Sequence, residues 1–271
     1  MPLRSTLQKK RNNMDLKISD QRFIVCGASS GFGEGIARQL LKEGAHVVLI
    51  ARRGNLLRDK FDHYKEQTEI IEGSLIYSET LDKIEKAVQA KETHGTVFNA
   101  GGPPTGTPLE TNMDDWDSAW KLVMRWKIDL ALRLAPYFKQ KEYGRMVFIE
   151  SQSVKQPLPS LSLSNSFRAG VVGFVKTLAL EIAGSGVTAN VLAPGSHGTP
   201  AIERVIQKNK ASLNISFEEA KQQMEQNIPV GRMGTAEEFA SLATWLLSPH
   251  SGYVTGQTIS HDGGSIKGLF G

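Results

Sequence analysis

A glycine-rich turn is the segment of this chain with the clearest chemical meaning. Residues 26–33 read CGASSGFG, directly after the apolar run FIV and before a helix-like stretch at 34–43. Glycine lets the backbone adopt left-handed angles and approach a ligand closely, and the start of a helix offers free N–H groups and a positive dipole end. The turn therefore indicates binding of a dinucleotide pyrophosphate, although similar turns also join strands to helices in proteins that bind no nucleotide.

A pair of arginines marks the end of the next expected strand. Arg52 and Arg53 follow the run HVVLIA at residues 46–51, where a dinucleotide-binding domain meets the adenosine ribose. An acidic residue there would accept a hydrogen bond from the 2′-hydroxyl of NAD, whereas two guanidinium groups can pair with a 2′-phosphate. The pair favours NADP(H) as cofactor, and the alternative is that both arginines are solvated surface residues.

Seven short apolar or β-branched runs alternate with helix-like stretches along the 271 residues. Such alternation is typical of a parallel sheet that is covered by helices on both faces. We therefore predict an α/β fold with a Rossmann-type, doubly wound, seven-stranded parallel sheet in a single domain. The expected strands lie at residues 23–26, 46–50, 70–71, 96–98, 145–149, 187–192 and 258–260.

The first thirteen residues carry the whole positive excess of the chain. They contain four basic side chains and no acidic one, so residues 14–271 sum to zero within a net charge of +4. We predict a disordered basic leader at 1–13 and a folded domain at 14–271, with no basic groove for nucleic acid. No segment has the apolar length of a secretory signal or a membrane span. The protein is therefore expected to be cytoplasmic, without a membrane partner.

Metal and disulfide chemistry are not expected. Cys26 is the single cysteine, so no internal disulfide can form, and the six histidines fall in no metal-binding spacing. Cys26 itself is expected to be a small buried residue at the end of a strand.

Further motifs follow the glycine turn in a fixed order. They are FNAGG at 98–102, NVLAPGSHGT at 190–199, IPVGR at 228–232, YVTGQ at 253–257 and DGG at 262–264. Together with the turn, they resemble the classical short-chain dehydrogenase/reductase family, in particular its 3-oxoacyl-[acyl-carrier-protein] reductase-like members, over residues 16–265. The resemblance implies the family's fold, a small-molecule carbonyl or alcohol substrate, and assembly as a homodimer or homotetramer.

The resemblance also implies a cofactor site at the matching positions. The turn would wrap the pyrophosphate, the FNAGG motif would flank the adenine ribose, and the motif after the sixth strand would meet the nicotinamide. Where the family places an aspartate against the adenine, this chain has Ser74, which can still form a hydrogen bond, though a weaker one. The implied cofactor residues are Gly27, Ser29, Ser30, Gly31, Phe32, Gly33, Arg52, Arg53, Ser74, Leu75, Asn99, Ala100, Gly101, Arg168, Pro194, Gly195 and Thr199.

The catalytic half departs from the family's pattern. Ser151 matches the family's serine, but Ser164 stands where the catalytic tyrosine is expected and Arg168 where the lysine is expected. Val123 replaces an asparagine that supports the proton relay. The tyrosine and lysine at 137 and 141 do have the family's spacing, but they lie on the helix before the Ser151 strand, on the wrong side of that strand.

Loss of the tyrosine removes the usual proton donor. A serine hydroxyl is a far weaker acid than a phenol, and a missing general acid typically lowers the rate by about 10²- to 10⁴-fold. Arg168 keeps a positive charge and can bond ribose hydroxyls, so we interpret it as a cofactor ligand. Three alternative proton donors remain. They are Lys155 on the loop after Ser151, His197, and a water held between Ser151, Ser164 and Arg168.

A polar insertion at residues 200–228 follows the sixth strand and suggests two small helices, at 203–206 and 217–221. Its position favours a substrate lid over the alternative of a plain surface insertion. Helices expected at 116–138 and 165–183 correspond to those that pair in the family's oligomers. Phe174, Leu178 and Leu180 are either interface residues or core residues.

These patterns predict an NADP(H)-dependent oxidoreductase that acts on a ketone or secondary alcohol, with Ser151 polarising the oxygen. The complete cofactor motifs and the positive charge at Arg168 favour catalysis. The alternative is a catalytically impaired NADP(H)-binding sensor or assembly protein, for which the missing tyrosine is the argument. A lyase or isomerase is a third reading.

Overall fold

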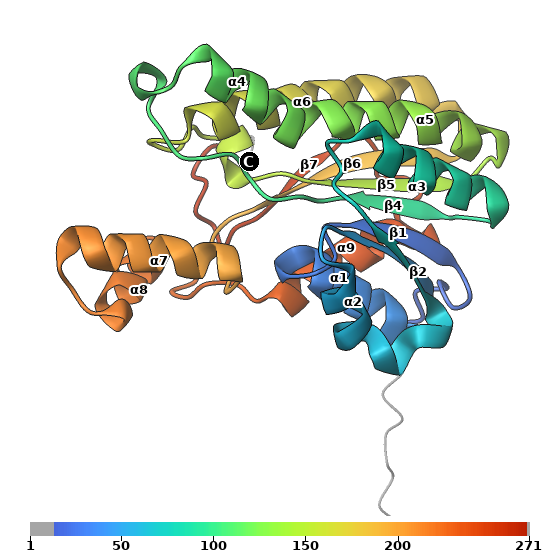
Figure 1. Cartoon of the computed structure of the whole chain (residues 1–271), viewed down its shortest axis with the longest axis horizontal. Coiled ribbons are helices and arrows are strands. Elements are labelled where there is room, and N and C mark those ends of the chain that lie inside the picture. The colour runs from blue at the N-terminus through green and yellow to red at the C-terminus, as the bar shows by residue number, and fades with distance from the viewer. Residues whose placement is uncertain (1–13, 270–271) are drawn as a thin grey trace, which may run out of the picture.

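Seven parallel strands form the centre of the molecule (Figure 1). In the computed structural model, which describes residues 14–269, they pair in the order β3-β2-β1-β4-β5-β6-β7. The strands are β1 Arg22–Cys26, β2 His46–Ala51, β3 Thr68–Glu72, β4 Gly95–Phe98, β5 Gly144–Ile149, β6 Val187–Pro194 and β7 Thr258–His261. The predicted doubly wound parallel sheet is therefore confirmed, and each strand covers its expected position.

Helices cover both faces of this sheet (Figure 1). Ile24 and Cys26 point into the core on one face, whereas Phe23 and Val25 point into the core on the other, because successive strand residues face opposite sides. Burial on both sides explains why the strand sequences are almost continuously apolar. One face carries α3 Ser78–Ala90, α4 Met113–Ala119, α5 Trp126–Gln140 and α6 Ser162–Ile182, and the other carries α1 Gly31–Lys42, α2 Gly54–Phe61 and α9 Ala236–Leu247.

The strand order places β1 between β2 and β4. In open parallel sheets, ligands bind at such a point, outside the carboxyl ends of the strands where the order reverses. Cys26 pairs with Ile50 of β2, and Val25 pairs with Val97 of β4. The glycine turn, the arginine pair and the FNAGG motif are therefore brought to one edge of the sheet.

The long helix expected at 116–138 is interrupted in the structure. A π-helical segment, Trp120–Arg125, separates α4 from α5. A π turn holds one more residue than an α turn, so the residues after it are rotated by about 100°. The indole N–H of Trp126 donates to the Leu122 carbonyl oxygen at 2.9 Å, which provides a partner for a carbonyl group within this irregular turn.

Two helices after β6 stand apart from the sheet (Figure 1). They are α7 Pro200–Leu213 and α8 Phe217–Gln226, both longer than the sequence indicated. Ile206 and Ala220 from these helices form a small apolar cluster with Ile228 and Met233. The pair therefore has its own small core and is attached to the main domain at its two ends.

The described chain begins with residues 14–21, where Ile18 is buried in the core on the α1 side of the sheet. The predicted leader at 1–13 lies outside the described residues. Across residues 14–269, no helix combines the length and the apolar character that crossing a membrane requires.

Candidate functional site

A cavity of about 550 Å³ lies at the carboxyl ends of the strands. It gathers residues from the ends of β1, β2, β4 and β5 and from α6 and α7, which are far apart in the sequence. Of the predicted cofactor residues, it is lined by Gly27, Ser29, Ser30, Gly31, Phe32, Arg52, Arg53, Ser74, Leu75, Asn99, Ala100, Gly101, Arg168 and Thr199. Gly33, Pro194 and Gly195 are not part of this lining.

The glycine turn is held tightly against the end of β4. Gly27 has a φ of +65°, and a Cβ added there would lie 2.7 Å from the Asn99 carbonyl oxygen. A Cβ at Gly33 would lie 2.3 Å from the carbonyl oxygen of Gly27. The Asn99 amide donates to the carbonyl oxygens of Cys26 and Gly27 at 3.3 and 3.4 Å. Only glycine fits at both turn positions, so the backbone itself forms the floor of the cavity.

Positive charge gathers at the end of the cavity next to β2. Arg52 and Arg53 are both exposed there, and the Arg53 guanidinium donates to the Ser29 hydroxyl at 3.4 Å. The Lys60 ammonium on α2 donates to the Ser29 carbonyl oxygen at 3.1 Å and forms an ion pair with Glu34. The sequence indicated the two arginines but not Lys60, which no motif marks.

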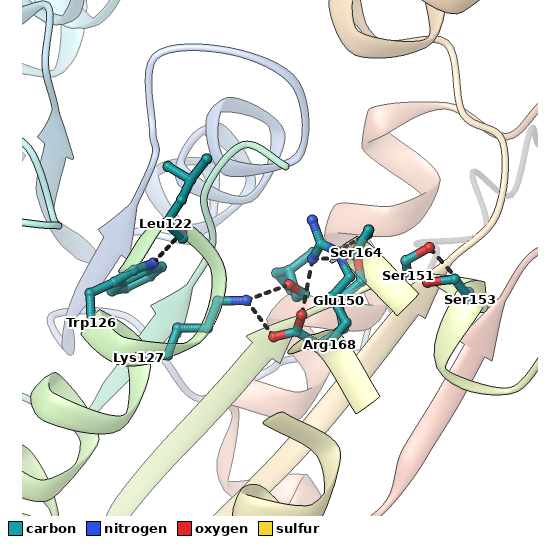
Figure 2. A network of polar contacts seen from close by, with 9 residues as sticks. Leu122, Trp126, Lys127, Glu150, Ser151, Ser153, Ser164 and Arg168 are labelled. Atoms are coloured by element: carbon teal, nitrogen blue, oxygen red, sulfur yellow. Dashed lines mark hydrogen bonds and ion pairs between the residues drawn. The ribbon is translucent and has the colours of Figure 1, made fainter. Parts of the chain in front are cut away.

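A chain of polar side chains borders the other end of the cavity (Figure 2). Arg168, on α6, donates from Nε to the Ser164 hydroxyl at 3.0 Å. Its Nη1 group donates to the Glu150 carboxylate at 3.0 Å and to the Glu150 carbonyl oxygen at 3.2 Å. Trp126 and Ile149 complete this end of the cavity. Ser164 and Arg168 are therefore joined directly, as their spacing of one helical turn allows.

Lys127 extends the polar chain into the core. Its ammonium group forms an ion pair with Glu150 and donates to the Ile149 carbonyl oxygen at 3.3 Å. The side chains of Lys127 and Glu150 are only 2% and 0% exposed. Burial lowers the pKa of Lys127 to about 8, and the neighbouring Arg168 acts in the same direction, while Glu150 opposes both.

Sequence reasoning missed Lys127 and Glu150. Residues at three, four and seven positions from Lys127 along α5 are Leu130, Ala131 and Leu134, all buried, so its place on the apolar face of the helix was a readable signal. Glu150 directly follows the apolar strand β5, where a charged residue reads equally well as the start of an exposed loop.

Ser151 lies beside this polar chain rather than within it (Figure 2). Its hydroxyl accepts a hydrogen bond from the backbone N–H of Ser153 at 3.1 Å and so caps the short helical turn Gln152–Val154. Lys155 follows that turn directly. Ser151, Lys155 and Ser164 are not part of the cavity lining, and of the predicted catalytic residues Ser164 and Arg168 are joined by a hydrogen bond.

His197 is turned away from the cavity. It is 3% exposed, and its ring packs edge-on against Phe32 and Phe239. Nδ1 lies 3.0 Å from the Gly195 carbonyl oxygen, and Nε2 lies 2.8 Å from Nδ1 of His261. Burial lowers the pKa of His197. Because both ring nitrogens are engaged on the α1 side of the sheet, the idea of His197 as the proton donor is wrong.

The tyrosine that has the family's spacing to a lysine is also remote from the cavity. The Tyr137 hydroxyl accepts a hydrogen bond from the backbone N–H of Thr93 at 3.0 Å. Thr93 precedes β4, so this contact lies at the amino ends of the strands, opposite the cavity. Tyr137 is therefore remote from the cavity as expected, but for a different reason: α5 lies on the same face of the sheet as α6, and Tyr137 is at the other end of the strands.

A family model described as enoyl-(acyl carrier protein) reductase matches residues 27–265, most of the chain. The chain belongs to the short-chain dehydrogenase/reductase family. The matched region includes Ser164 and Arg168.

Similarity to known short-chain dehydrogenases/reductases extends over nearly the whole chain. The NADPH-dependent reductase BacG of Bacillus subtilis is 27% identical over 259 residues, which cover 93% of this chain and 100% of BacG. A putative ketoacyl reductase of Streptomyces coelicolor is 31% identical over 252 residues, covering 89% of this chain and 95% of that protein. The structure of L-sorbose reductase from Gluconobacter frateurii, complexed with NADPH and L-sorbose, has a TM-score of 0.89 at 27% identity, covering 94% of this chain and 100% of that one.

Replacing Gly33 by alanine tests the close packing of the turn. A methyl group 2.3 Å from the Gly27 carbonyl oxygen must push the turn aside, so we expect a loss of about 1–3 kcal/mol of stability in denaturant unfolding. Gly173→Ala, on the exposed side of α6 with no atom within 4 Å of the new methyl group, is the control. It should be neutral or stabilising by about 0.5–1 kcal/mol. Equal stabilities of the two variants would contradict the close approach.

The buried Lys127 predicts a pH-dependent stability. Its pKa is lowered from 10.5 to about 8 on folding, so between these pH values the unfolded chain binds a proton that the folded protein has lost. The free energy of unfolding of the wild type should therefore rise from about pH 8 to 10.5, relative to that of Lys127→Met, and be parallel to it below pH 8. Denaturant titrations of both proteins across this range measure the difference, and parallel curves throughout would contradict the lowered pKa.

Proposed function

We propose that this protein is an NADP(H)-dependent oxidoreductase that interconverts a ketone and a secondary alcohol. The observation that carries the proposal is the single cavity that joins the glycine turn, the arginine pair and Arg168. Similar proteins support it, because they are named as an NADPH-dependent reductase and a ketoacyl reductase, and a solved relative holds NADPH and L-sorbose.

The two ends of the cavity fit the two ends of NADP(H). Arg52 and Arg53 offer exposed guanidinium groups for the 2′-phosphate. The backbone of the glycine turn, in which Gly27 and Gly31 have positive φ values, would approach the pyrophosphate closely. At the opposite end, Arg168 would bond the nicotinamide ribose, whereas Thr199 lies beside Gly31 of the turn.

The residues of this chain must hold the substrate oxygen and bring it a proton. When bound, NADPH supplies a hydride to the carbonyl carbon. Ser151 would donate a hydrogen bond to the carbonyl oxygen, because its hydroxyl only accepts from the Ser153 N–H and keeps its own O–H for donation. The Ser164 hydroxyl accepts from Arg168, so its own O–H is left to donate. Lys155 and a water between these groups are the candidate proton sources.

Contacts of α7 support the assignment of residues 200–228 as a lid. Ala201 and Arg204 line the first cavity from α7. The Lys208 ammonium donates to the Thr105 hydroxyl, on the loop after β4, at 3.3 Å. A second cavity of about 610 Å³ is lined by that loop, by α4 and by the start of α6, and Lys208 reaches it from α7. The lid would therefore cover both the cofactor and the space for a substrate.

Exposed apolar residues on α5 and α6 support assembly as a homodimer or homotetramer. Leu180 is 75% exposed and Leu132 is 57% exposed, and both helices form the outer layer on one face of the sheet (Figure 1). Leu178 is a core residue, whereas Phe174 is half-buried. Of the three residues considered for the interface, Leu180 is therefore the best candidate.

A non-catalytic NADP(H) sensor is the second candidate function. One observation favours it, because Ser151, the residue that matches the family's pattern, lies outside the cavity lining and is bonded to the backbone of its own loop. In such a protein, cofactor binding would change the position of α7 and α8, and a partner would recognise that change.

Ser151→Ala separates the two candidates. Wild type is titrated with NADPH by fluorescence and offered ketones, β-keto esters and thioesters, and then alcohols with NADP⁺. We expect turnover, and a loss of about 10²-fold or more in Ser151→Ala with NADPH binding retained. Ser241→Ala, on the exposed surface of α9, is the control. Binding without turnover across the panel would favour the sensor.

The arginine pair predicts cofactor preference. Changing Arg52 and Arg53 to alanine should weaken NADPH binding by about 10- to 100-fold, because charge-assisted bonds to the 2′-phosphate are lost, and should change NADH binding little. Arg58→Ala is the control, because Arg58 is an exposed arginine of α2 that is not in the cavity lining. An equal loss for both cofactors would count against the 2′-phosphate assignment.

A further inference from the structure

Two buried charged residues are assigned no role by the family resemblance: Glu150 lies in the wall of the cavity, and Lys127 is buried behind it. We propose that Glu150 is a positioning residue that aims the Arg168 guanidinium at the cofactor cavity, and that Lys127 leaves that end of the cavity with one surplus positive charge, which favours the reduced over the oxidised cofactor. The inference rests on the proposed function, because it concerns the same NADP(H) site.

The hydrogen bonds of Arg168 fix its orientation. Nε is bonded to Ser164, and Nη1 is bonded twice to Glu150. Nη2 has no hydrogen-bond acceptor among residues 14–269, although the Arg168 side chain is 10% exposed. A Cβ added to Gly102 would lie 3.4 Å from Nη2, so this group faces the loop after β4 that borders the cavity. A buried guanidinium group with an unused donor fits a ligand that carries acceptor oxygens.

The polar chain contains two cations and one anion. Glu150 pairs with both Arg168 and Lys127, and all three side chains are at least nine-tenths buried. One cation would be enough to neutralise the carboxylate, and burying a second cation without a counter-ion of its own is unfavourable. Glu150 therefore holds Arg168 in place, while Lys127 leaves the chain with a net positive charge beside the cavity.

This surplus charge acts differently on the two forms of the cofactor. The nicotinamide ring of NADP⁺ is positively charged, whereas that of NADPH is neutral. A nearby uncompensated cation therefore weakens NADP⁺ binding more than NADPH binding. The same charge stabilises the negative oxygen that develops when a ketone accepts a hydride. Both effects favour reduction of the substrate.

The local structure directs Lys127 inward. The π-helical segment Trp120–Arg125 ends just before it, and the extra residue rotates the start of α5 by about 100°. Trp126, bonded to Leu122, lines the cavity, and the next residue, Lys127, enters the core toward Glu150. π turns of this kind occur frequently at functional sites.

The charge on Lys127 can change within an accessible pH range. Its ammonium faces Glu150 of the β5 end, Arg168 of α6 and the Cys26 thiol of β1, and it lies 5.8 Å from the Trp126 ring. Arginine does not titrate, and burial raises the pKa of Cys26 above its usual range. Lys127, with a pKa of about 8, is therefore the group that changes the net charge of the chain between pH 7 and pH 9.

The test measures dissociation constants of NADPH and NADP⁺ at pH 7 and pH 9. In wild type, the ratio of the NADP⁺ constant to the NADPH constant should fall by about threefold or more as the pH rises. Lys127→Met should keep the low ratio at both pH values, whereas Lys127→Arg, which stays charged, should keep the high ratio at both. Lys139→Met, which removes an exposed lysine of the same helix, should behave as wild type.

Glu150→Gln tests positioning separately. Without the carboxylate, Arg168 loses its strongest partner, and both cofactors should bind about tenfold more weakly or worse, as for other supporting partners of ligand residues. A folded Glu150→Gln with wild-type affinities would overturn the positioning role. If this variant does not fold, Glu150→Asp replaces it, because the shorter side chain keeps the negative charge but draws the carboxylate away from Arg168; wild-type affinities in folded Glu150→Asp would overturn the positioning role.

The outcomes distinguish the inference from the proposed function. If wild type binds neither NADPH nor NADP⁺, the proposed function is wrong. If wild type binds both, and folded Lys127→Met keeps the wild-type ratio and its pH dependence, only the inference is wrong, and the buried pair is a structural contact. Circular dichroism and thermal unfolding establish that each variant is folded.

Discussion

The carboxylate of Glu150, directly after strand β5, connects the end of that strand to helices α5 and α6. Lys127 reaches it from α5 and Arg168 from α6, and its side chain is 0% exposed. Removing one member of such a buried network typically destabilises a protein by about 3–5 kcal/mol, because the remaining charges lose their compensation. The wall of the cavity next to β5 depends on this contact, since Arg168 has no other anionic partner among the described residues.

The cavity has two walls of different construction. Next to β1 and β4, the wall is backbone, held by the Asn99 amide and by glycines that leave no room for a side chain. Next to β5 and α6, it is made of charged side chains that support each other. A backbone wall suits a phosphate, which is bound by N–H groups. A wall of side chains determines the charge around the reacting atoms.

This difference explains what could be predicted from the sequence. The sheet, the glycine turn and Arg52 with Arg53 were predictable, because strand periodicity and glycine geometry are local properties. The contact between Lys127 and Glu150 was not predictable, because the two residues are 23 positions apart. The π turn that sets the direction of Lys127 precedes it at Trp120–Arg125, and no sequence signal marks that turn. The wrong expectation for His197 has the same origin. Its place in the chain suggested the cavity, but packing against Phe32 directs its ring to the other side of the sheet.

The bond between His197 and His261 also determines which nitrogen atoms carry hydrogen. The Gly195 carbonyl oxygen can only accept, so Nδ1 of His197 must be protonated, and its Nε2 is then the acceptor for the N–H at Nδ1 of His261. Both tautomers are thereby determined. The ring of His197 therefore links the loop that carries Gly195 to the end of β7 at a second point, beside the backbone bond between the Gly195 N–H and the His261 carbonyl oxygen.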